Sequence, residues 1–389
     1  MAKPVLQCEK LNRILDNREI SRYDIDDVFK GALHNQYELF ETAKYLRHKY
    51  KNKTITFSKK VFFNLINLCR DKCSYCTYKA ELSDSKLTLM DKTHVAQLAR
   101  LAKKYRCVEA LLVTGEKPED KYEYARYWLK KNGFKNSAEY LIHISELVLN
   151  EGLFPHTNAG NLNIEDMHEL RKTNSSVGIM IENISDRLTK KGMPHHKAPS
   201  KRFENRLKTL TNAGKLKIPI TTGLLIGIGE TYNEIIDSIY AIKEAHKNFG
   251  NIQEIILQNF LPKSDTEMKY YPAPTEMYFK IIVALCRIIM PEANIQIPPN
   301  LSSKSYQNFL DAGINDWGGI SPLTPDYVNP ECPWPKIHTI KNNTEKMGLI
   351  LKSRFPVYPE FMKYIDKNVR DKMNPIMDKD LLVKSEYWL

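Results

Sequence analysis

Short apolar runs alternate with longer stretches of helical periodicity along most of the chain. Eight runs are rich in β-branched and aromatic residues and have the length of strands; they span 61–66, 109–114, 154–158, 177–182, 220–226, 254–259, 295–298 and 316–321. Apolar residues at helical spacing predict helices over 94–105, 138–151, 165–172, 201–213, 232–247, 275–289 and 303–312. Strands that alternate with helices are typical of parallel sheets. Eight such units predict an α/β fold, a closed (β/α)8 barrel of the TIM type.

A barrel of this kind takes about 250 residues, so it accounts for most of the 389 residues. We place it at residues 54–334, with a helical N-terminal extension at 1–53 and a C-terminal extension at 335–389. The C-terminal extension is basic, contains aromatic residues and lacks the alternation of a strand. The proline-rich stretch 321–335 predicts an extended loop, because proline lacks the amide hydrogen that a helix interior needs.

Composition narrows the class of protein without naming a function. With 42% hydrophobic residues the chain is expected to fold, and its net charge of +12 comes from lysines interleaved with acids. Interleaved charges are typical of solvated helix faces, so we do not expect a nucleic-acid surface. No apolar run approaches the roughly 18 residues that cross a bilayer, and the first residues lack a secretory apolar core. We therefore expect a cytoplasmic protein.

Three of the seven cysteines lie together, directly after the first predicted strand. Cys69, Cys73 and Cys76 form a C-x3-C-x2-C segment, and clustered cysteines in a reducing compartment are typical metal ligands. The other four stand alone and are expected to be buried apolar residues; they are Cys8, Cys107, Cys286 and Cys332. Three thiolates favour an iron–sulfur cluster with one open iron. A zinc site or a closed electron-transfer cluster would take a fourth protein ligand, and both stay open as alternatives.

Polar residues and glycines also follow the second to sixth predicted strands. They are Gly115-Glu116, Asn158, Glu182-Asn183, Gly227 with Glu230, and Gln258-Asn259. The active sites of (β/α)8 barrels lie at the C-terminal ends of the strands. Each residue alone is also explained as a cap of the next helix. Their convergence on one rim nevertheless predicts the active site there.

The three-cysteine loop at a barrel mouth resembles the radical S-adenosylmethionine (radical SAM) superfamily. This resemblance implies that Cys69, Cys73 and Cys76 hold a 4Fe-4S cluster whose open iron binds S-adenosyl-L-methionine (SAM). It places the aromatic ring of Tyr75 near the adenine. The resulting chemistry would be the one-electron cleavage of SAM to a 5′-deoxyadenosyl radical, so a one-electron reductant is an expected partner.

The resemblance also assigns residues further along the chain to SAM. Thr114-Gly115-Glu116 stands where the superfamily carries Gly-Gly-Glu, which contacts the amino group of SAM, and threonine replaces the first glycine. Glu182 stands where the ribose is held. In the superfamily, a G-x-I-x-G-x-x-E segment packs along the adenosine. This chain matches the segment with Gly223, Leu225, Gly227 and Glu230, with leucine in place of isoleucine.

Distal segments narrow the resemblance to one family. They are 154–158, 182–185 with 192–196, 221–231, and 311–322 continuing through 324–330. They resemble the 7,8-didemethyl-8-hydroxy-5-deazariboflavin (FO) synthases, subunit 1, of coenzyme F-420 biosynthesis. The resemblance implies a lyase that converts 5-amino-5-(4-hydroxybenzyl)-6-(D-ribitylimino)-5,6-dihydrouracil to FO, with release of ammonia, 5′-deoxyadenosine and methionine. Only one C-x3-C-x2-C is present, so a separate sister subunit (FO synthase subunit 2) would supply this small-molecule substrate.

The substrate is neutral and rich in hydrogen-bonding groups, which predicts amides and an aromatic face at the mouth. The predicted substrate-binding residues are Asn158, Gln258, Asn259, Asn300, Asn315 and Trp317. Asp316 is predicted to be catalytic, as a proton acceptor. A loop turn, a cap and core packing are the alternatives for Asn315, Asp316 and Trp317. We expect His195 and His196 to be a solvated pair on a surface loop.

Several other functions stay open as alternatives. The sister subunit that uses tyrosine and a cyclase of the menaquinone pathway are the nearest, and the segments 316–319 and 321–335 favour ring closure over both. An iron–sulfur electron carrier is an alternative of a different class, and it would hold its cluster with four protein ligands. An RNA-binding enzyme would need a basic module, but acids dilute the lysines of 335–389.

Overall fold

The computed structural model describes residues 1–18 and 20–389 and contains a closed barrel of eight parallel strands. The strands are β1 (Thr54–Ile66), β2 (Glu109–Thr114), β3 (Phe154–Asn158), β4 (Ser176–Gly178), β5 (Ile220–Ile226), β6 (Ile252–Asn259), β7 (Ile295–Gln296) and β8 (Asp316–Ile320). They follow one another in chain order, and β1 closes the barrel by pairing with both β8 and β2. The predicted (β/α)8 barrel is confirmed.

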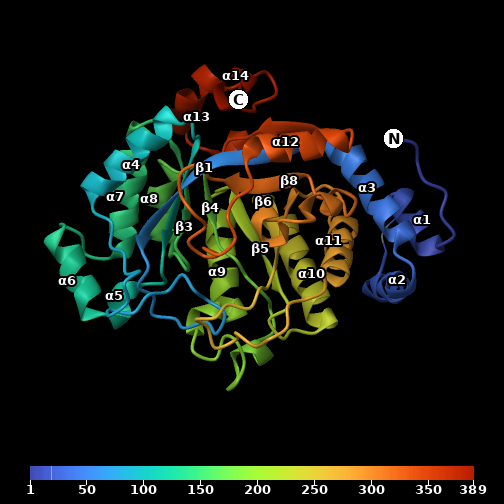
Figure 1. Ribbon diagram of the computed structural model, residues 1–389, viewed down its shortest axis with the longest axis horizontal. Helices are drawn as coiled ribbons and strands as arrows, with labels where there is room; N and C mark the ends of the chain where they lie inside the picture. Colours follow the sequence, from blue (N-terminus) through green and yellow to red (C-terminus); the bar gives the residue numbers. More distant parts are fainter. Residues whose placement is uncertain (19) are drawn as a thin grey trace.

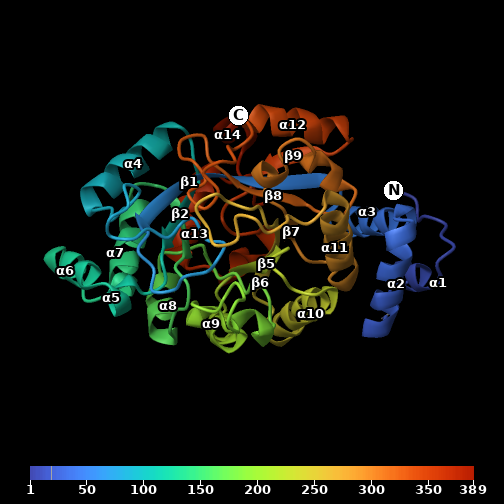
Figure 2. The same ribbon diagram turned by 60° about the horizontal axis from the view of Figure 1, so that its bottom comes forward.

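Helices surround the strands on the outside of the barrel (Figure 2). They are α4 (Lys92–Lys104), α5 (Pro118–Lys121), α6 (Glu123–Lys131), α7 (Ser137–Asn150), α8 (Ile164–Arg171), α9 (Phe203–Lys215), α10 (Tyr232–Phe249) and α11 (Glu276–Ile289). Their starts follow from the sequence. The side chains of Asp91, Asn136 and Asn163 accept hydrogen bonds from the first free amides of α4, α7 and α8.

Several boundaries differ from the prediction. Strand β1 begins at Thr54 rather than at the predicted residue 61. The polar residues Ser58 and Lys60 interrupt the apolar pattern of its first half, so the sequence did not indicate a strand there, although both residues are buried. Strands β4 and β7 are shorter than predicted. The stretch predicted as a helix over 303–312 contains only a 3-10 helix, Tyr306–Leu310.

In the described part of the chain three helices precede the barrel, and the second and third of them pack against α11 (Figure 1). They are α1 (Glu9–Leu15), α2 (Arg22–His34) and α3 (Tyr37–Lys51). Leu39, Ala43 and Leu46 of α3 are buried at helical spacing. Ser21 and Asp24 form a capping box that fixes the start of α2. These helices therefore extend the outer helical layer on one flank.

The C-terminal segment adds a ninth strand, so the prediction that it lacks strands is wrong. Its regular elements are α12 (Ile337–Lys346), β9 (Ile350–Ser353), α13 (Lys367–Met373) and α14 (Ser385–Trp388), with 3-10 turns at Pro359–Tyr364 and Asn374–Ile376. Strand β9 runs parallel to the first half of β1, with Thr54 opposite Ile350 and Phe57 opposite Ser353. Directly after β9, Arg354 is almost fully buried inside the barrel.

One large apolar core joins the barrel wall to its helices. Cys107 and Cys286 are fully buried in it, as predicted, whereas Cys8 and Cys332 are only partly buried, contrary to the prediction. Within residues 1–18 and 20–389, every helix is too short or too polar to cross a bilayer.

Candidate active site

The three clustered cysteines lie in the loop between β1 and α4, at the C-terminal end of β1. The amide of Glu116 donates to Cys69 Sγ over 3.2 Å, and the amide of Cys76 donates to the Cys73 carbonyl oxygen over 3.1 Å. Burial raises the pKa of the Cys69 thiol to about 12 and also raises the pKa of Cys73. Metal ligation requires thiolates. A cationic metal cluster would offset the cost of burying these thiolates, so the donor set fits an iron–sulfur cluster.

A second loop, between β4 and α9, supports the cysteine loop from the other side. The amides of Lys72 and Ser74 donate to the carbonyl oxygens of Lys197 and Pro194 over 2.8 and 2.9 Å. The buried carboxylate of Asp71 accepts a hydrogen bond from the Ser200 hydroxyl. The cysteine positions are therefore fixed by backbone contacts and do not depend on a bound metal alone.

The Thr114-Gly115-Glu116 segment lies against the cysteine loop. A Cβ atom on Gly115 would stand 2.1 Å from the Leu68 carbonyl oxygen and 2.7 Å from Cys69 Cβ, so only glycine allows this approach. The Thr114 hydroxyl is buried and has no hydrogen-bond partner among residues 1–18 and 20–389, which leaves it free to bind a ligand. The Glu116 carboxylate instead accepts from the Asn161 amide over 3.0 Å. Its side chain joins two loops, which agrees with a backbone role toward SAM.

Glu182 follows β4 and has a left-handed backbone, with φ of 60°. Its amide donates to the Gly223 carbonyl oxygen over 3.1 Å, which attaches it to β5. Its buried carboxylate lies 2.5 Å from Lys201 Nζ. A ribose hydroxyl bound here would share this carboxylate with Lys201, so the ribose contact remains a prediction.

The segment that resembles the adenosine-packing motif covers the end of β5 and the following turn. The carboxylate of Glu230 accepts from the amides of Gly227 and Ile228 over 2.6 and 2.8 Å. Burial raises the pKa of Glu230. Glu230 therefore shapes the turn, while Gly223 and Leu225 lie within β5 itself. Leu225 belongs to a small apolar cluster against which Tyr75 packs, so Tyr75 lies beside this segment; the contacts of both with SAM stay predictions.

The prediction that His195 and His196 form a solvated pair is wrong for His195. His196 is exposed, but His195 is only 2% exposed. His195 Nε2 lies 3.0 Å from the Tyr75 hydroxyl, and burial, with Lys201 and Arg206 nearby, lowers its pKa to about 3. Sequence reasoning missed His195 because a His-His pair after Pro194 carries no apolar signal. The structure shows that it positions the aromatic ring of the cysteine loop.

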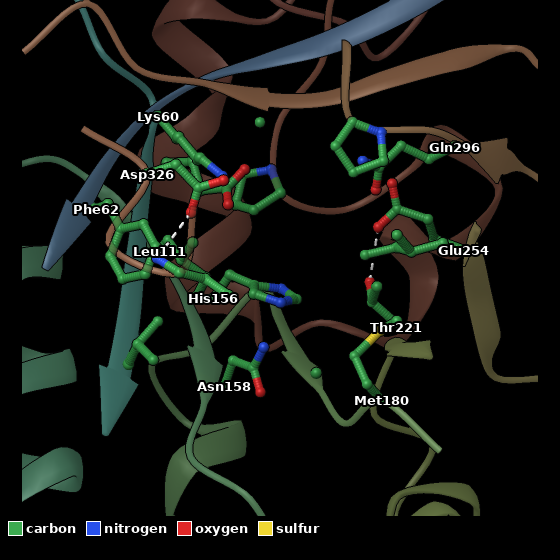
Figure 3. Close-up of a pocket in the computed structure, with 18 of the residues that line it drawn as sticks. Lys60, Phe62, Leu111, His156, Asn158, Met180, Thr221, Glu254, Gln296 and Asp326 are labelled. Atoms are coloured by element: carbon green, nitrogen blue, oxygen red, sulfur yellow. Dashed lines mark hydrogen bonds between the residues drawn. The ribbon is translucent and has the colours of Figure 1, made fainter. Parts of the chain in front are cut away.

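The barrel interior next to these loops is a cavity lined by residues from nearly every strand. Asn158 and Gln258, both predicted to bind substrate, line it. Additional polar residues that line it were missed by the sequence prediction: Lys60, Glu109, His156, Thr221, Glu254, Gln296, Asp326, Asn329 and Arg354. Figure 3 shows Lys60 and Asp326 on one side of this space and Glu254 and Gln296 on the other, with His156 projecting between them.

The structure does not bring Asn315 and Trp317 to the cavity. Trp317 is fully buried, and its indole donates to the Thr344 hydroxyl over 3.1 Å, so it packs between the barrel and α12. Asn315 accepts from Arg287 over 2.9 Å. Both side chains are used for structure, because the N-terminal end of β8 lies opposite the mouth.

Three further predicted residues are also held by protein partners. Asp316 is fully buried and paired with Arg354, Nε to Oδ2, at 2.7 Å. This pairing argues against Asp316 as a proton acceptor. Asn300 donates to Asp326 over 3.0 Å and so holds the carboxylate of Asp326, which lines the cavity. Asn259 donates to the Leu301 carbonyl oxygen over 3.4 Å, and its own side-chain oxygen has no partner in the part of the chain that the structure describes.

A hydrogen-bonded ion pair holds the loop after β4 to the start of α10. Glu234 accepts from Arg187 Nε over 2.9 Å and from the Ser185 hydroxyl over 2.5 Å. The hydrogen bond from Arg187 is the main cause that lowers the pKa of Glu234 to about 2, below the roughly 4.3 of an unfolded chain. The carboxylate therefore stabilises the fold above about pH 4.3.

We expect Glu234→Gln to lower the free energy of unfolding by about 0.5–1 kcal/mol at pH 7, because solvent screens this partly exposed pair. The difference from wild type should shrink as the pH falls from about 4.3 toward 2, where the native carboxylate gains its proton. Urea unfolding at a series of pH values measures it. A difference that stays constant over this range would contradict the assignment.

Comparisons with known proteins agree with this geometry. A model of the radical SAM superfamily matches residues 63–240. The fold is similar to that of a crystal structure of methylornithine synthase, with a TM-score of 0.70 over 88% of this chain and 97% of that one, at 15% identity. The barrel and its three-cysteine loop thus define a radical SAM enzyme.

Curated relatives specify the family. A 7,8-didemethyl-8-hydroxy-5-deazariboflavin synthase of Methanopyrus kandleri is 40% identical over 329 residues, which cover 84% of this chain and 98% of that protein. The same-named protein of Methanococcus maripaludis strain C6 is 44% identical over 340 residues, 86% of this chain and 94% of that one. The chain belongs to this FO synthase family, whose radical SAM enzymes serve FO biosynthesis.

Proposed function

We propose that this protein is the ring-closing subunit of FO synthesis. It takes 5-amino-5-(4-hydroxybenzyl)-6-(D-ribitylimino)-5,6-dihydrouracil, closes the third ring and releases ammonia, as a carbon–nitrogen lyase. The observation that carries the proposal is a three-cysteine loop beside a barrel cavity rich in hydrogen-bonding side chains, in a chain of the FO synthase family; Cys76 packs against the apolar cluster that contains Phe62 and Val113 of the cavity wall.

The residues of the mouth fit the cofactors that this activity needs. Cys69, Cys73 and Cys76 would hold a 4Fe-4S cluster with one open iron, and the free Thr114 hydroxyl and the ring of Tyr75 would contact SAM. Together the cluster and SAM would supply a 5′-deoxyadenosyl radical, at the cost of one electron from a reductant. The chain's own task is then to orient the substrate and exclude water and other hydrogen donors.

The cavity fits the proposed substrate in its chemistry. The adduct carries a pyrimidine dione, a phenol and a ribityl chain, all of which donate or accept hydrogen bonds. Asn158, Gln258 and Gln296 offer amides, and Phe62 and Trp334 offer aromatic faces. This combination of amide edges and aromatic rings is expected for a neutral ligand with two rings and several hydroxyl groups.

We further propose that a separate sister subunit makes the adduct. An FO synthase of Nocardia farcinica is 41% identical over 318 residues, but these cover only 37% of that protein. The chain thus matches one part of that longer enzyme. It contains a single C-x3-C-x2-C segment. A second radical SAM unit on another polypeptide would complete the pathway.

The proposal is tested by anaerobic reconstitution with iron and sulfide, followed by addition of SAM, dithionite and synthetic adduct. We expect fluorescent FO, with one 5′-deoxyadenosine and one methionine formed per FO, measured by mass spectrometry. Free tyrosine with 5-amino-6-ribitylaminouracil serves as the matched control and should give no product. Consumption of tyrosine instead would assign the protein as the sister subunit, and the absence of both reactions would contradict a role in either step.

A further inference from the structure

His156 is a buried histidine in the wall of the cavity that the proposed function leaves unassigned. It lies in the middle of β3, two residues before Asn158, so both side chains point into the barrel. On the neighbouring strand β4, a Cβ atom on Gly178 would stand 2.8 Å from His156 Nε2 and 3.6 Å from Asn158 Cγ. The missing side chain at Gly178 therefore leaves the edge of the imidazole facing the cavity, as Figure 3 shows.

The protonation of the imidazole follows from its hydrogen bonds. His156 Nδ1 lies 2.6 Å from the Ser176 hydroxyl oxygen. That hydroxyl donates its one hydrogen to the Pro356 carbonyl oxygen, which has none to give. The Ser176 oxygen must therefore accept from His156, so Nδ1 carries the hydrogen. In the neutral ring Nε2 then holds a bare lone pair, directed to the cavity.

The surroundings keep the ring neutral at ordinary pH. Burial lowers the pKa of His156 to about 4. Glu109 on β2 opposes this effect, whereas Lys60 on β1 and Arg354 from the C-terminal segment reinforce it. These three charged groups and the ring line the same cavity. A buried neutral imidazole with a fixed tautomer is prepared to accept a hydrogen bond, and a proton, from a ligand in the cavity.

The proposed reaction creates a need for such an acceptor. Comparison of the adduct with FO plus ammonia shows that the substrate also loses two hydrogens. The 5′-deoxyadenosyl group takes one as an atom, so the other must leave as a proton. In a cavity lined by protein, a side chain with a free lone pair is placed to receive it.

We propose that His156 is a catalytic residue, the base that takes this proton through Nε2 during ring closure. The inference rests on the proposed function. In the step, a bond from hydrogen to the substrate breaks, its electron pair stays in the forming aromatic ring, and the proton joins the lone pair of Nε2. The ring-closed radical then holds one electron more than FO, and this electron would return to the iron–sulfur cluster that supplied one for the cleavage of SAM. The imidazolium passes the proton on to ammonia as it leaves, which restores the neutral ring. Ser176 and the Pro356 carbonyl are positioning groups, since they fix which nitrogen faces the substrate.

The test is His156→Gln in the reconstituted full-length enzyme, with His168→Gln as the matched control. Glutamine keeps a hydrogen-bonding group near the position of Nε2 but does not accept a proton at neutral pH. His168 is an exposed histidine on α8. We expect FO formation to fall by roughly 10²-fold or more in kcat. Formation of 5′-deoxyadenosine should persist within about tenfold and become uncoupled from FO, and KM for the adduct should change little. The control should match wild type.

The outcomes separate the inference from the function on which it rests. If wild type makes FO and His156→Gln makes it at the same rate, or loses 5′-deoxyadenosine and FO in parallel, the base assignment is overturned and ring closure stands. If wild type makes no FO from the adduct, the proposed function fails first. Nitrogen NMR of the wild-type protein with labelled histidine needs no variant. It should show a protonated Nδ1 and a bare Nε2 at His156, and the opposite tautomer would overturn the inference.

Discussion

Replacing Cys73 with alanine should abolish the iron–sulfur cluster and FO formation while leaving the barrel folded. We expect the same of Cys69→Ala and Cys76→Ala, because each removes one of the three thiolates that the loop offers. Loss of activity should exceed about 100-fold, since even groups that only support a metal ligand typically contribute 10–100-fold. Iron and sulfide content, and the paramagnetic spectrum of the reduced protein with and without SAM, measure the effect.

The control for the cluster is Cys8→Ala. Cys8 is partly buried next to α1, far from the mouth in the fold, and should be dispensable for the cluster. The variants of the loop should keep a wild-type circular dichroism spectrum, because Lys197 and Pro194 hold its backbone. A full cluster in Cys73→Ala, with a spectrum that still responds to SAM, would show that another ligand binds the iron. The open-iron arrangement would then be wrong.

The barrel and its mouth could be predicted from the sequence because both leave local patterns. Apolar runs separated by helical periods mark the strands, and the C-x3-C-x2-C segment lies within eight consecutive positions. Asn158 and Gln258 line the cavity and lie in the last two positions of their strands, and their contact with the substrate stays a prediction. Residues at strand ends are placed by the chain's own periodicity, without knowledge of what packs against them.

The cavity wall could not be predicted in the same way. Lys60 lies in the middle of β1 and Glu109 is the first residue of β2, and charged residues at these positions give no local sign that their side chains line a cavity. Asp316 and Trp317 are consecutive residues of β8, so their side chains point to opposite faces of the sheet. Only the packing of α12 and of the C-terminal segment decides which groups each side chain contacts. Contacts between residues distant in sequence are set by tertiary packing, and a single sequence carries no direct signal for them.

The C-terminal segment makes the largest such contact. Arg354 enters the barrel directly after β9 and lies 2.7 Å from Asp316 and 2.8 Å from Glu254. All three side chains are almost fully buried, and the Tyr358 hydroxyl also donates to Glu254 over 2.8 Å. Two buried carboxylates thus share one guanidinium, in a geometry that closes the end of the barrel opposite the cysteine loop.

We expect Arg354→Met to lower the free energy of unfolding by about 3–5 kcal/mol at neutral pH, because it leaves these carboxylates buried without a partner. Lys352→Met is the matched control, since its ion pairs with Asp378 and Asp380 are partly exposed and should contribute at most about 1 kcal/mol. Urea unfolding of the full chain measures both. A loss in Arg354→Met no larger than in the control would contradict the role of the buried network.

The pH dependence of that loss separates uncompensated charge from lost packing. Burial already raises the pKa of Glu254, and Arg354 is the main group that opposes this. Without Arg354 the native pKa of Glu254 rises further above the unfolded value, so the destabilisation is present at neutral pH and declines as the pH falls and the Glu254 carboxylate binds a proton. A packing defect would be constant with pH. Because Pro356 follows Arg354 by two residues and holds Ser176 against His156, the same variant should also lower FO formation.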